Sequence, residues 1–158
     1  MGLFAPKSIA VTLIVASVAA VAGTTSAGLG WPVWAMFIGW IAFFTGEQAL
    51  GGGLRSYLCV VVGITLGNLA ASGIGILVPV FGTFALGAVV FVIAIVVLSL
   101  RFAPYLNNIP ACFLGLVAFF AAHVEPASPA SFELVAVGGL GSAAAVVAHA
   151  LQTRVARA

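Results

Sequence analysis

Charged side chains are scarce in this chain. They make up 5% of its 158 residues, whereas hydrophobic residues make up 64%. A soluble domain carries about a quarter charged residues, because its surface must stay hydrated. So few charges cannot coat a water-facing globule, whereas lipid tolerates an apolar surface. Long polar segments are missing too, so we expect residues 1–158 to form a single transmembrane domain with no extramembrane domain.

The sequence also lacks the patterns of several enzyme classes. It has no glycine loop of the Walker type, no nucleophile elbow and no pair of carboxylates inside an apolar stretch. We therefore expect a protein that is not an enzyme and that holds no cofactor. The formal net charge is only +2, and its one-sided placement favours contact with anionic lipid rather than with nucleic acid.

Cysteine is rare, and the sequence offers little for binding a metal ion. Cys59 and Cys112 both lie in apolar stretches, which predicts small buried side chains rather than a disulfide framework. Glu47 and His149 fall at a similar depth, and Cys, His and Glu are possible ligands of transition metals. These four residues belong to four separate stretches with no ligand spacing, so we predict no metal site.

Six apolar stretches predict six transmembrane helices. Residues 24–30 and the glycines at 51–53 are expected to be breaks between them. A helix needs about 20 residues to cross the hydrocarbon layer, and the second and fifth stretches hold fewer apolar residues than that. We expect those two helices to lie within the protein rather than against lipid. The predicted helices are residues 8–23, 31–46, 55–78, 83–100, 109–123 and 132–153.

The positions of the basic residues predict the orientation. If each stretch crosses the membrane once, all five basic residues fall on one side: Lys7, Arg55, Arg101, Arg154 and Arg157. Lys and Arg accumulate on the cytoplasmic side, so both chain ends are expected inside. The apolar run after Lys7 also resembles part of a secretory signal. We interpret it as the first helix, because five further apolar stretches follow.

Two segments carry similar sequences. FIGWIAFF at 37–44 and FLGLVAFF at 113–120 share five identical positions, and each lies in the middle helix of a three-helix half. Because each half has an odd number of helices, the second half must be inverted relative to the first. We therefore predict a 3+3 inverted-topology repeat with halves of about 1–80 and 81–158.

In transporters with such repeats, short helices at matching positions point to the substrate path. The four phenylalanines of the similar segments could form an aromatic constriction that admits small solutes and resists ions. In the alternative interpretation they only fill space, while Gly39 and Gly115 allow close helix packing. The four are Phe43, Phe44, Phe119 and Phe120.

Polar side chains also occur inside the apolar stretches. Asn68 lies about midway along the third stretch, beside Gly63 and Gly67, and Ser142 lies midway along the sixth. One interpretation is hydrogen bonding between helices, with small residues letting the backbones approach. The other is a midplane solute site with donors and acceptors but no net charge, which Thr65 could join.

The stretch GLGWPVWAMFIGWIAFFTGEQALGGG, together with NIPACFLGLVAFF, resembles the YcdZ-like family of small bacterial inner-membrane proteins. Members share a helix rich in Gly and Trp, a glycine-rich inner loop and a proline at the start of the fifth helix. The resemblance implies six helices and a multi-pass location in the bacterial inner membrane. The family is a domain of unknown function, so the resemblance supplies no site residue.

These observations predict a passive channel or facilitator for a small, mostly neutral solute. No ionisable group lies in the centre of any stretch, which favours passive flow over ion-coupled pumping. The path is expected between the second, third, fifth and sixth helices, with Asn68 and Ser142 contacting the solute. The alternative is a non-transporting subunit whose small-residue faces bind another membrane protein, and an intramembrane enzyme or metal protein is a third possibility. Either leading interpretation predicts a homo-oligomer.

Overall fold

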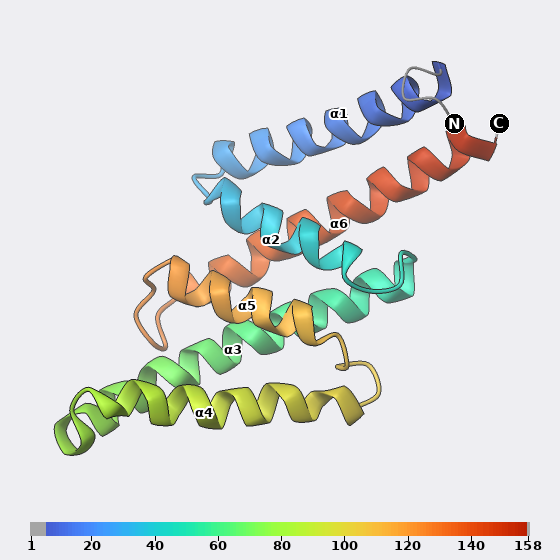
Figure 1. Cartoon of the computed structure of the whole chain (residues 1–158). Coiled ribbons are helices and arrows are strands. Elements are labelled where there is room, and N and C mark those ends of the chain that lie inside the picture. Colours follow the sequence, from blue (N-terminus) through green and yellow to red (C-terminus); the bar gives the residue numbers. More distant parts are fainter. Residues whose placement is uncertain (1–5, 158) are drawn as a thin grey trace.

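The computed structural model describes residues 6–157, which are all-helical and contain no strand (Figure 1). Six α-helices and one short 3-10 helix follow each other along the chain. They are α1 (Pro6–Gly28), α2 (Val33–Phe44), α3 (Leu50–Phe81), α4 (Phe84–Ser99), η1 (Leu100–Phe102), α5 (Ile109–Ala121) and α6 (Ala130–Arg157).

Four of these segments are long and apolar enough to cross a membrane: α1, α3, α4 with η1, and α6. The chain is therefore a membrane protein, because a soluble fold would not leave such helices open to the outside. The helices α2 and α5 have 12 and 13 residues, which corresponds to roughly 20 Å each. The prediction that these two are short is confirmed.

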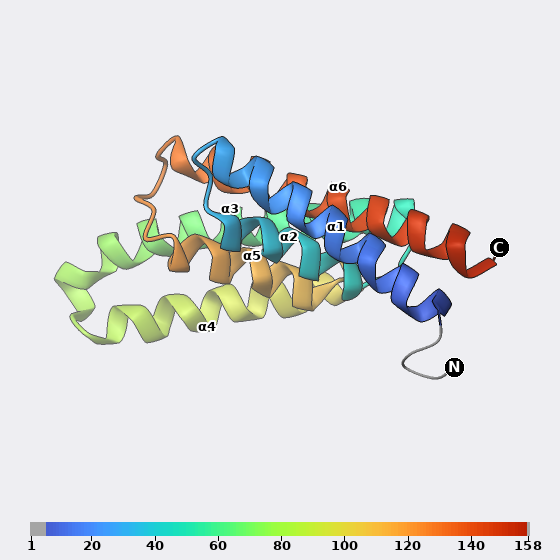
Figure 2. The same ribbon diagram turned by 90° about the horizontal axis from the view of Figure 1, so that it is seen from above.

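The helices α3 and α6 run antiparallel, and each carries one of the short helices. The short α2 packs mainly on α6, and the short α5 packs mainly on α3. The helix α1 flanks α6 at one edge of the molecule and α4 flanks α3 at the other (Figures 1 and 2). Each short helix thus packs on a long helix from the other half of the chain.

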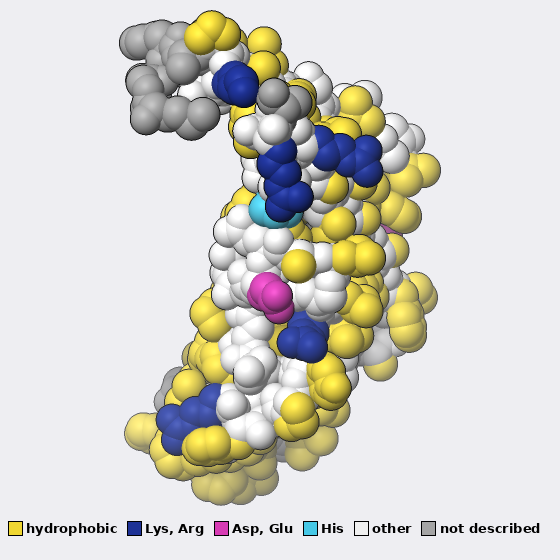
Figure 3. Space-filling view, turned by 90° about the vertical axis from the view of Figure 1, so that its right-hand side faces the viewer, with side chains coloured by type: hydrophobic (Ala, Val, Ile, Leu, Met, Phe, Trp, Pro, Cys, Tyr) yellow, Lys and Arg dark blue, Asp and Glu magenta, His cyan; other side chains and the backbone are white. Residues whose placement is uncertain are grey.

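One end of the molecule collects the basic side chains. The start of α1 and the end of α6 lie together there (Figure 1). Lys7 opens α1, Arg55 lies in the first turns of α3, Arg101 follows α4, and Arg154 lies near the end of α6. We call this end the basic end (Figure 3). The opposite end, with the α1–α2, α3–α4 and α5–α6 connections, is the far end.

The first predicted break is wrong for most of its length, because α1 continues through residues 24–28. The two threonines there direct their hydroxyls back into the helix. Thr24 Oγ1 donates to the carbonyl of Ala20 and Thr25 Oγ1 to that of Val21, each over 2.8 Å. Such bonds satisfy the hydroxyl without breaking the helix, so polar side chains here did not mark a loop.

The second predicted break, at 51–53, is also wrong, because α3 begins at Leu50. Here glycine provides space rather than flexibility. A Cβ atom at Gly52 would overlap the backbone of Glu47, and one at Gly53 would lie 2.8 Å from Val146 Cγ2. The glycine run allows the loop after α2 and a side chain of α6 to approach the first turn of α3.

The remaining helices begin and end near the predicted positions. The helix α5 starts at Ile109, as predicted, where the Asn108 side chain accepts a hydrogen bond from the backbone N–H of Ala111. An asparagine at this position satisfies one of the free N–H groups of the first turn. The helix α6 runs longer than predicted at both ends, from Ala130 to Arg157.

Candidate functional site

The short helix α2 contacts α6 backbone to backbone. A Cβ atom at Gly39 would overlap the carbonyl oxygen of Gly138, and one at Gly141 would overlap that of Met36. The hydroxyl of Ser142 donates to the carbonyl of Gly39 over 3.0 Å in the same contact. Such close approach is possible only without side chains, so this contact leaves no room for a solute.

The short helix α5 contacts α3 in the same way. A Cβ atom at Gly63 would overlap the carbonyl oxygen of Cys112, and one at Gly115 would overlap that of Val60. Glycines therefore allow direct backbone contact in both short-helix packings, which leaves no space between the helices there. Free space lies elsewhere: two cavities lie along the seam between the two long helices, α3 and α6, and a third, of about 430 Å³, is lined by α1, α2 and α6.

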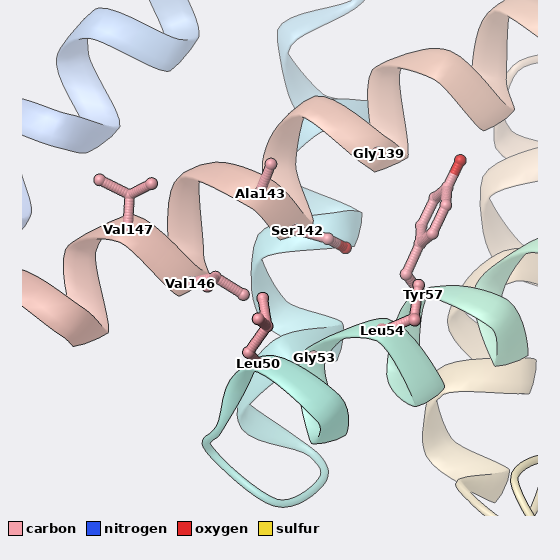
Figure 4. A pocket seen from close by; sticks show the side chains of 9 residues that line it. All are labelled: Leu50, Gly53, Leu54, Tyr57, Gly139, Ser142, Ala143, Val146 and Val147. Atoms are coloured by element: carbon pink, nitrogen blue, oxygen red, sulfur yellow. The ribbon is translucent and has the colours of Figure 1, made fainter.

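The first cavity on this seam lies towards the basic end and has a volume of about 370 Å³. We call it the basic-end cavity. In Figure 4, side chains from the first turns of α3 and from the middle of α6 surround it. Apart from Tyr57 and Ser142 its lining is apolar or glycine. The lining residues are Leu50, Gly53, Leu54, Tyr57, Gly139, Ser142, Ala143, Val146 and Val147.

A second cavity, of about 390 Å³, lies on the seam towards the far end. We call it the far-end cavity. The middle of α3, the α5–α6 loop and the first turns of α6 line it, and four of the lining side chains are polar and uncharged. The lining residues are Ile64, Thr65, Asn68, Leu69, Ala127, Ser128, Ser131, Phe132 and Val135.

Hydrogen bonds hold the polar wall of the far-end cavity. Asn68 Nδ2 donates to Ser131 Oγ over 2.9 Å, and Asn68 Oδ1 accepts from the backbone N–H of Ala127 over 2.8 Å. Thr65 Oγ1 donates to the carbonyl of Val61 in its own helix. Ser128 Oγ is buried and has no hydrogen-bond partner among the described residues.

Tyr57 lies where the two cavities approach each other. It lines the basic-end cavity, and its hydroxyl donates over 3.0 Å to the carbonyl oxygen of Val135, which lines the far-end cavity. Opposite the ring, a Cβ atom at Gly139 would lie 3.1 Å from the hydroxyl. Gly139 on α6 therefore makes room for the tyrosine of α3.

The four phenylalanines singled out in the sequence do not gather into one constriction. Phe43 and Phe119 are fully packed, with 0% and 1% exposure, whereas Phe44 and Phe120 are 43% and 45% exposed. The rings form two separate edge-to-face pairs, with centroids 5.2 Å apart in Phe43–Phe44 and 5.5 Å apart in Phe119–Phe120. Neither pair lines the cavities on the seam.

The three polar residues predicted to contact a solute are divided between the cavities. Ser142 lines the basic-end cavity, whereas Asn68 and Thr65 line the far-end cavity. Ser142 and Asn68 also join helices through their hydrogen bonds. These side chains therefore join helices and also line cavities, and they lie at two separate positions rather than at one.

Sequence reasoning missed Asn108, which organises the basic end. Its Nδ2 donates to Thr45 Oγ1 and to Ser56 Oγ, each over 2.8 Å. These bonds connect the end of α2, the first turns of α3 and the start of α5. No local sequence pattern indicated this contact, because the two hydroxyl partners are distant from Asn108 in sequence.

The possible metal ligands do not converge. Cys59 and Cys112 are free and buried, whereas the ring of His149 packs against Phe43, with centroids 5.6 Å apart. Within residues 6–157, no three side chains of His, Cys, Asp or Glu are grouped closely enough to hold a metal ion.

Comparison with known proteins places the chain in a family. Residues 12–153 match the family described as "Protein of unknown function (DUF1097)". The match covers most of the chain, so this protein belongs to that family. Neither the curated proteins nor the solved structures contain a match.

Proposed function

We propose that this protein is a passive channel or facilitator for a small, mostly neutral solute in the bacterial inner membrane, and that the solute moves along the α3–α6 seam. The observation that carries the proposal is the pair of similarly sized cavities on that seam, one towards each end of the molecule. A route with one chamber on each side of a central barrier suits passive exchange.

The proposal includes the inverted repeat, in which α1–α3 correspond to α4–α6. The glycine contacts support it, because they occur in matching pairs. Gly39 against Gly138 corresponds to Gly115 against Val60, and Gly141 against Met36 corresponds to Gly63 against Cys112. The main helix contacts also match, since α2 on α6 corresponds to α5 on α3.

The same correspondence relates the cavities. Applied to the seam, it pairs Gly53 with Ser131, Tyr57 with Val135, and Ala143 with Thr65; the first member of each pair lines the basic-end cavity and the second the far-end cavity. Two chance hollows would not share equivalent walls. This match supports the proposed repeat and agrees with a substrate path at a repeat interface.

The chemistry of the walls indicates the class of solute. No Lys, Arg, Asp, Glu or His lines either cavity, so an ion would lose its hydration without compensation. The lining of the far-end cavity includes hydroxyl and amide groups, from Thr65, Asn68 and Ser131. A small neutral molecule with hydrogen-bonding groups fits these walls.

A second copy of the chain is proposed to cover the seam. The residues at the cavity mouths are open to the outside in a single chain, with Leu54 59% and Phe132 78% exposed. In a bilayer, acyl chains would fill an uncovered groove. A homo-oligomer in which the seam of one copy faces another would exclude lipid from the route.

The orientation is part of the proposal, with the basic end and both chain termini in the cytoplasm. Clustering of Lys and Arg at one end (Figure 3) supports it through the positive-inside rule. The Gly- and Trp-rich sequence of α2 further suggests that the chain groups with the YcdZ-like bacterial proteins.

Solute uptake into proteoliposomes tests the function. We expect glycerol or urea to equilibrate faster than into protein-free liposomes, whereas sodium does not. Filling either cavity, with Ala143→Trp or Thr65→Trp, should slow uptake at least tenfold. Val90→Trp is the control, because Val90 is 55% exposed on α4 and lines neither cavity. Uptake equal to that of empty liposomes would exclude this function.

The alternative function, a subunit that binds another membrane protein, has its own supporting observation. The outward faces of α2 and α5 expose large apolar side chains between 40% and 55%: Trp34, Phe37, Ile41, Phe44, Phe113, Val117 and Phe120. Both helices are shorter than the hydrocarbon layer, so the irregular backbone at their ends needs protein around it. Absence of flux together with a stoichiometric co-purifying membrane protein would favour this alternative.

A further inference from the structure

The two cavities approach each other at one side chain. The ring of Tyr57 forms part of the wall of the basic-end cavity, and the backbone of Val135 belongs to the far-end cavity. The hydroxyl-to-carbonyl hydrogen bond of 3.0 Å joins these two walls. Tyr57 and Val135 are also equivalent positions in the proposed repeat, so this bond lies close to its pseudo-two-fold axis.

The surroundings of Tyr57 allow its ring to move. Its hydroxyl contacts α6 at Gly139, where a Cβ atom would lie 3.1 Å from the hydroxyl and 3.2 Å from the ring carbon that bears it. A larger residue at Gly139 would push the ring away, whereas glycine lets it rest against the helix. The ring also borders the open volume of the basic-end cavity (Figure 4), which leaves space on that side of the ring.

We propose that Tyr57 is the gate of the route. With its hydroxyl on the carbonyl of Val135 the two cavities are separate, and release of that bond joins them. This inference rests on the proposed function, because it assigns the barrier within the same route. It also assigns to Tyr57 the constriction that the four phenylalanines had been expected to form.

The gate also selects the class of solute. When the gate opens, the Tyr57 hydroxyl loses its acceptor and the Val135 carbonyl loses this donor. A neutral molecule that carries both a donor and an acceptor, such as a polyol or an amide, can bond to both groups as it passes. A purely apolar molecule offers no hydrogen bond to the half-buried Tyr57 hydroxyl, and leaving that hydroxyl without a partner is unfavourable.

Labelling of single cysteines from each side of the membrane tests the gate without relying on transport. The chain is used in a Cys59→Ala, Cys112→Ala background with a cysteine at Ala143 or at Thr65, which line opposite cavities. With Tyr57 present, an impermeant thiol reagent should reach Ala143→Cys only from the basic end and Thr65→Cys only from the far end. With Tyr57→Ala, labelling from the opposite side should become at least tenfold faster at both positions.

Two further variants separate the hydroxyl from the ring. Tyr57→Phe removes only the hydrogen bond and should accelerate opposite-side labelling by a smaller factor than Tyr57→Ala. Gly139→Ala keeps the tyrosine and adds a Cβ atom 3.1 Å from its hydroxyl, which crowds the hydrogen bond; it should act in the same direction, with a smaller effect, even if Tyr57→Ala does not fold. Tyr105→Ala, at the other tyrosine of the chain, should leave labelling unchanged.

Glycerol uptake by the same variants distinguishes failure of the gate from failure of the function. Faster opposite-side labelling without any glycerol or urea flux would keep the gate and overturn the proposed function. Flux in the wild-type protein with labelling and uptake unaltered by Tyr57→Ala and Gly139→Ala would overturn the gate alone. Cysteines that react equally from both sides in the presence of Tyr57 would also overturn it.

Discussion

The hydroxyl of Ser142 on α6 donates a hydrogen bond to the carbonyl oxygen of Gly39 on α2, over 3.0 Å. The contact joins the first half of the chain to the second, at the place where a Cβ atom on Gly39 would overlap the backbone of Gly138. A single contact thus combines a hydrogen bond with close backbone packing. The two contributions have very different energies, and substitution can separate them.

We expect Gly39→Ala to be far more damaging than Ser142→Ala. The added methyl group must push α2 off α6, which we estimate to cost about 3 kcal/mol or more. The lost hydrogen bond should cost about 0.6 kcal/mol, a typical value for a bond between helices in a membrane. Titration with a denaturing detergent measures both. Gly87→Ala is the control, since nothing lies within 4 Å of its Cβ position, and equal losses for Gly39→Ala and Gly87→Ala would contradict the packing argument.

Neighbouring phenylalanines should differ in their effects. Phe43 is fully buried between α2 and α6, so Phe43→Ala should lower the free energy of unfolding by about 3 kcal/mol. Phe44 is 43% exposed, and Phe44→Ala should cost well under half as much. Because neither ring lines the cavities, Phe44→Ala should also leave glycerol uptake unchanged. A large change in uptake with Phe44→Ala would indicate that the solute route runs along the aromatic segments instead.

Asn68 should be coupled to Ser131. Asn68→Ala removes two hydrogen bonds, one to Ser131 and one from Ala127, whereas Ser131→Ala removes only one of them. A double-mutant cycle on unfolding free energies should give a coupling of about 0.5–1.7 kcal/mol. The same cycle between Asn68 and Ser142, which share no bond, should give a coupling near zero. A coupling near zero in both cycles would mean that the hydrogen bond between Asn68 and Ser131 adds no stability.

The orientation can be tested with two exposed glycines at opposite ends. Gly28 ends α1 at the far end, Gly51 lies in the first turn of α3 at the basic end, and both have open space at the Cβ position. In intact cells, an impermeant thiol reagent should label Gly28→Cys and not Gly51→Cys. Permeabilised cells should label both. The opposite pattern would place the basic end outside.

Much of the architecture could be predicted from the residues because lipid imposes simple rules. The scarcity of charge predicted a membrane protein, the apolar runs predicted six helices, and the lengths of the runs identified α2 and α5 as the short ones. Local polarity was a poor guide to breaks. Thr24 and Thr25 bond within α1, and the glycines at 52 and 53 fit against neighbouring segments inside a continuous α3.

The candidate site was less predictable, because its walls come from segments that are distant in sequence. Asn68, Thr65 and Ser142 were singled out as polar residues within apolar stretches, and each of them lines a cavity. Repetition of Phe43–Phe44 in Phe119–Phe120 suggested a shared aromatic site. The α-helical period instead turns the first ring of each pair into the core and the second outward. No sequence pattern marked Tyr57, because its proposed role as a gate depends on the glycine opposite it on α6.

The sequence by itself determined that this chain is helical, that it lies in a membrane and that its basic residues belong at one end, because these properties follow from hydration and from the spacing of apolar runs. Only the tertiary structure decided that α2 packs on α6 and α5 on α3, with glycines in both contacts, and that two cavities lie on the seam between α3 and α6. Packing between distant segments depends on the shapes of both surfaces at once, and neither segment contains that information alone.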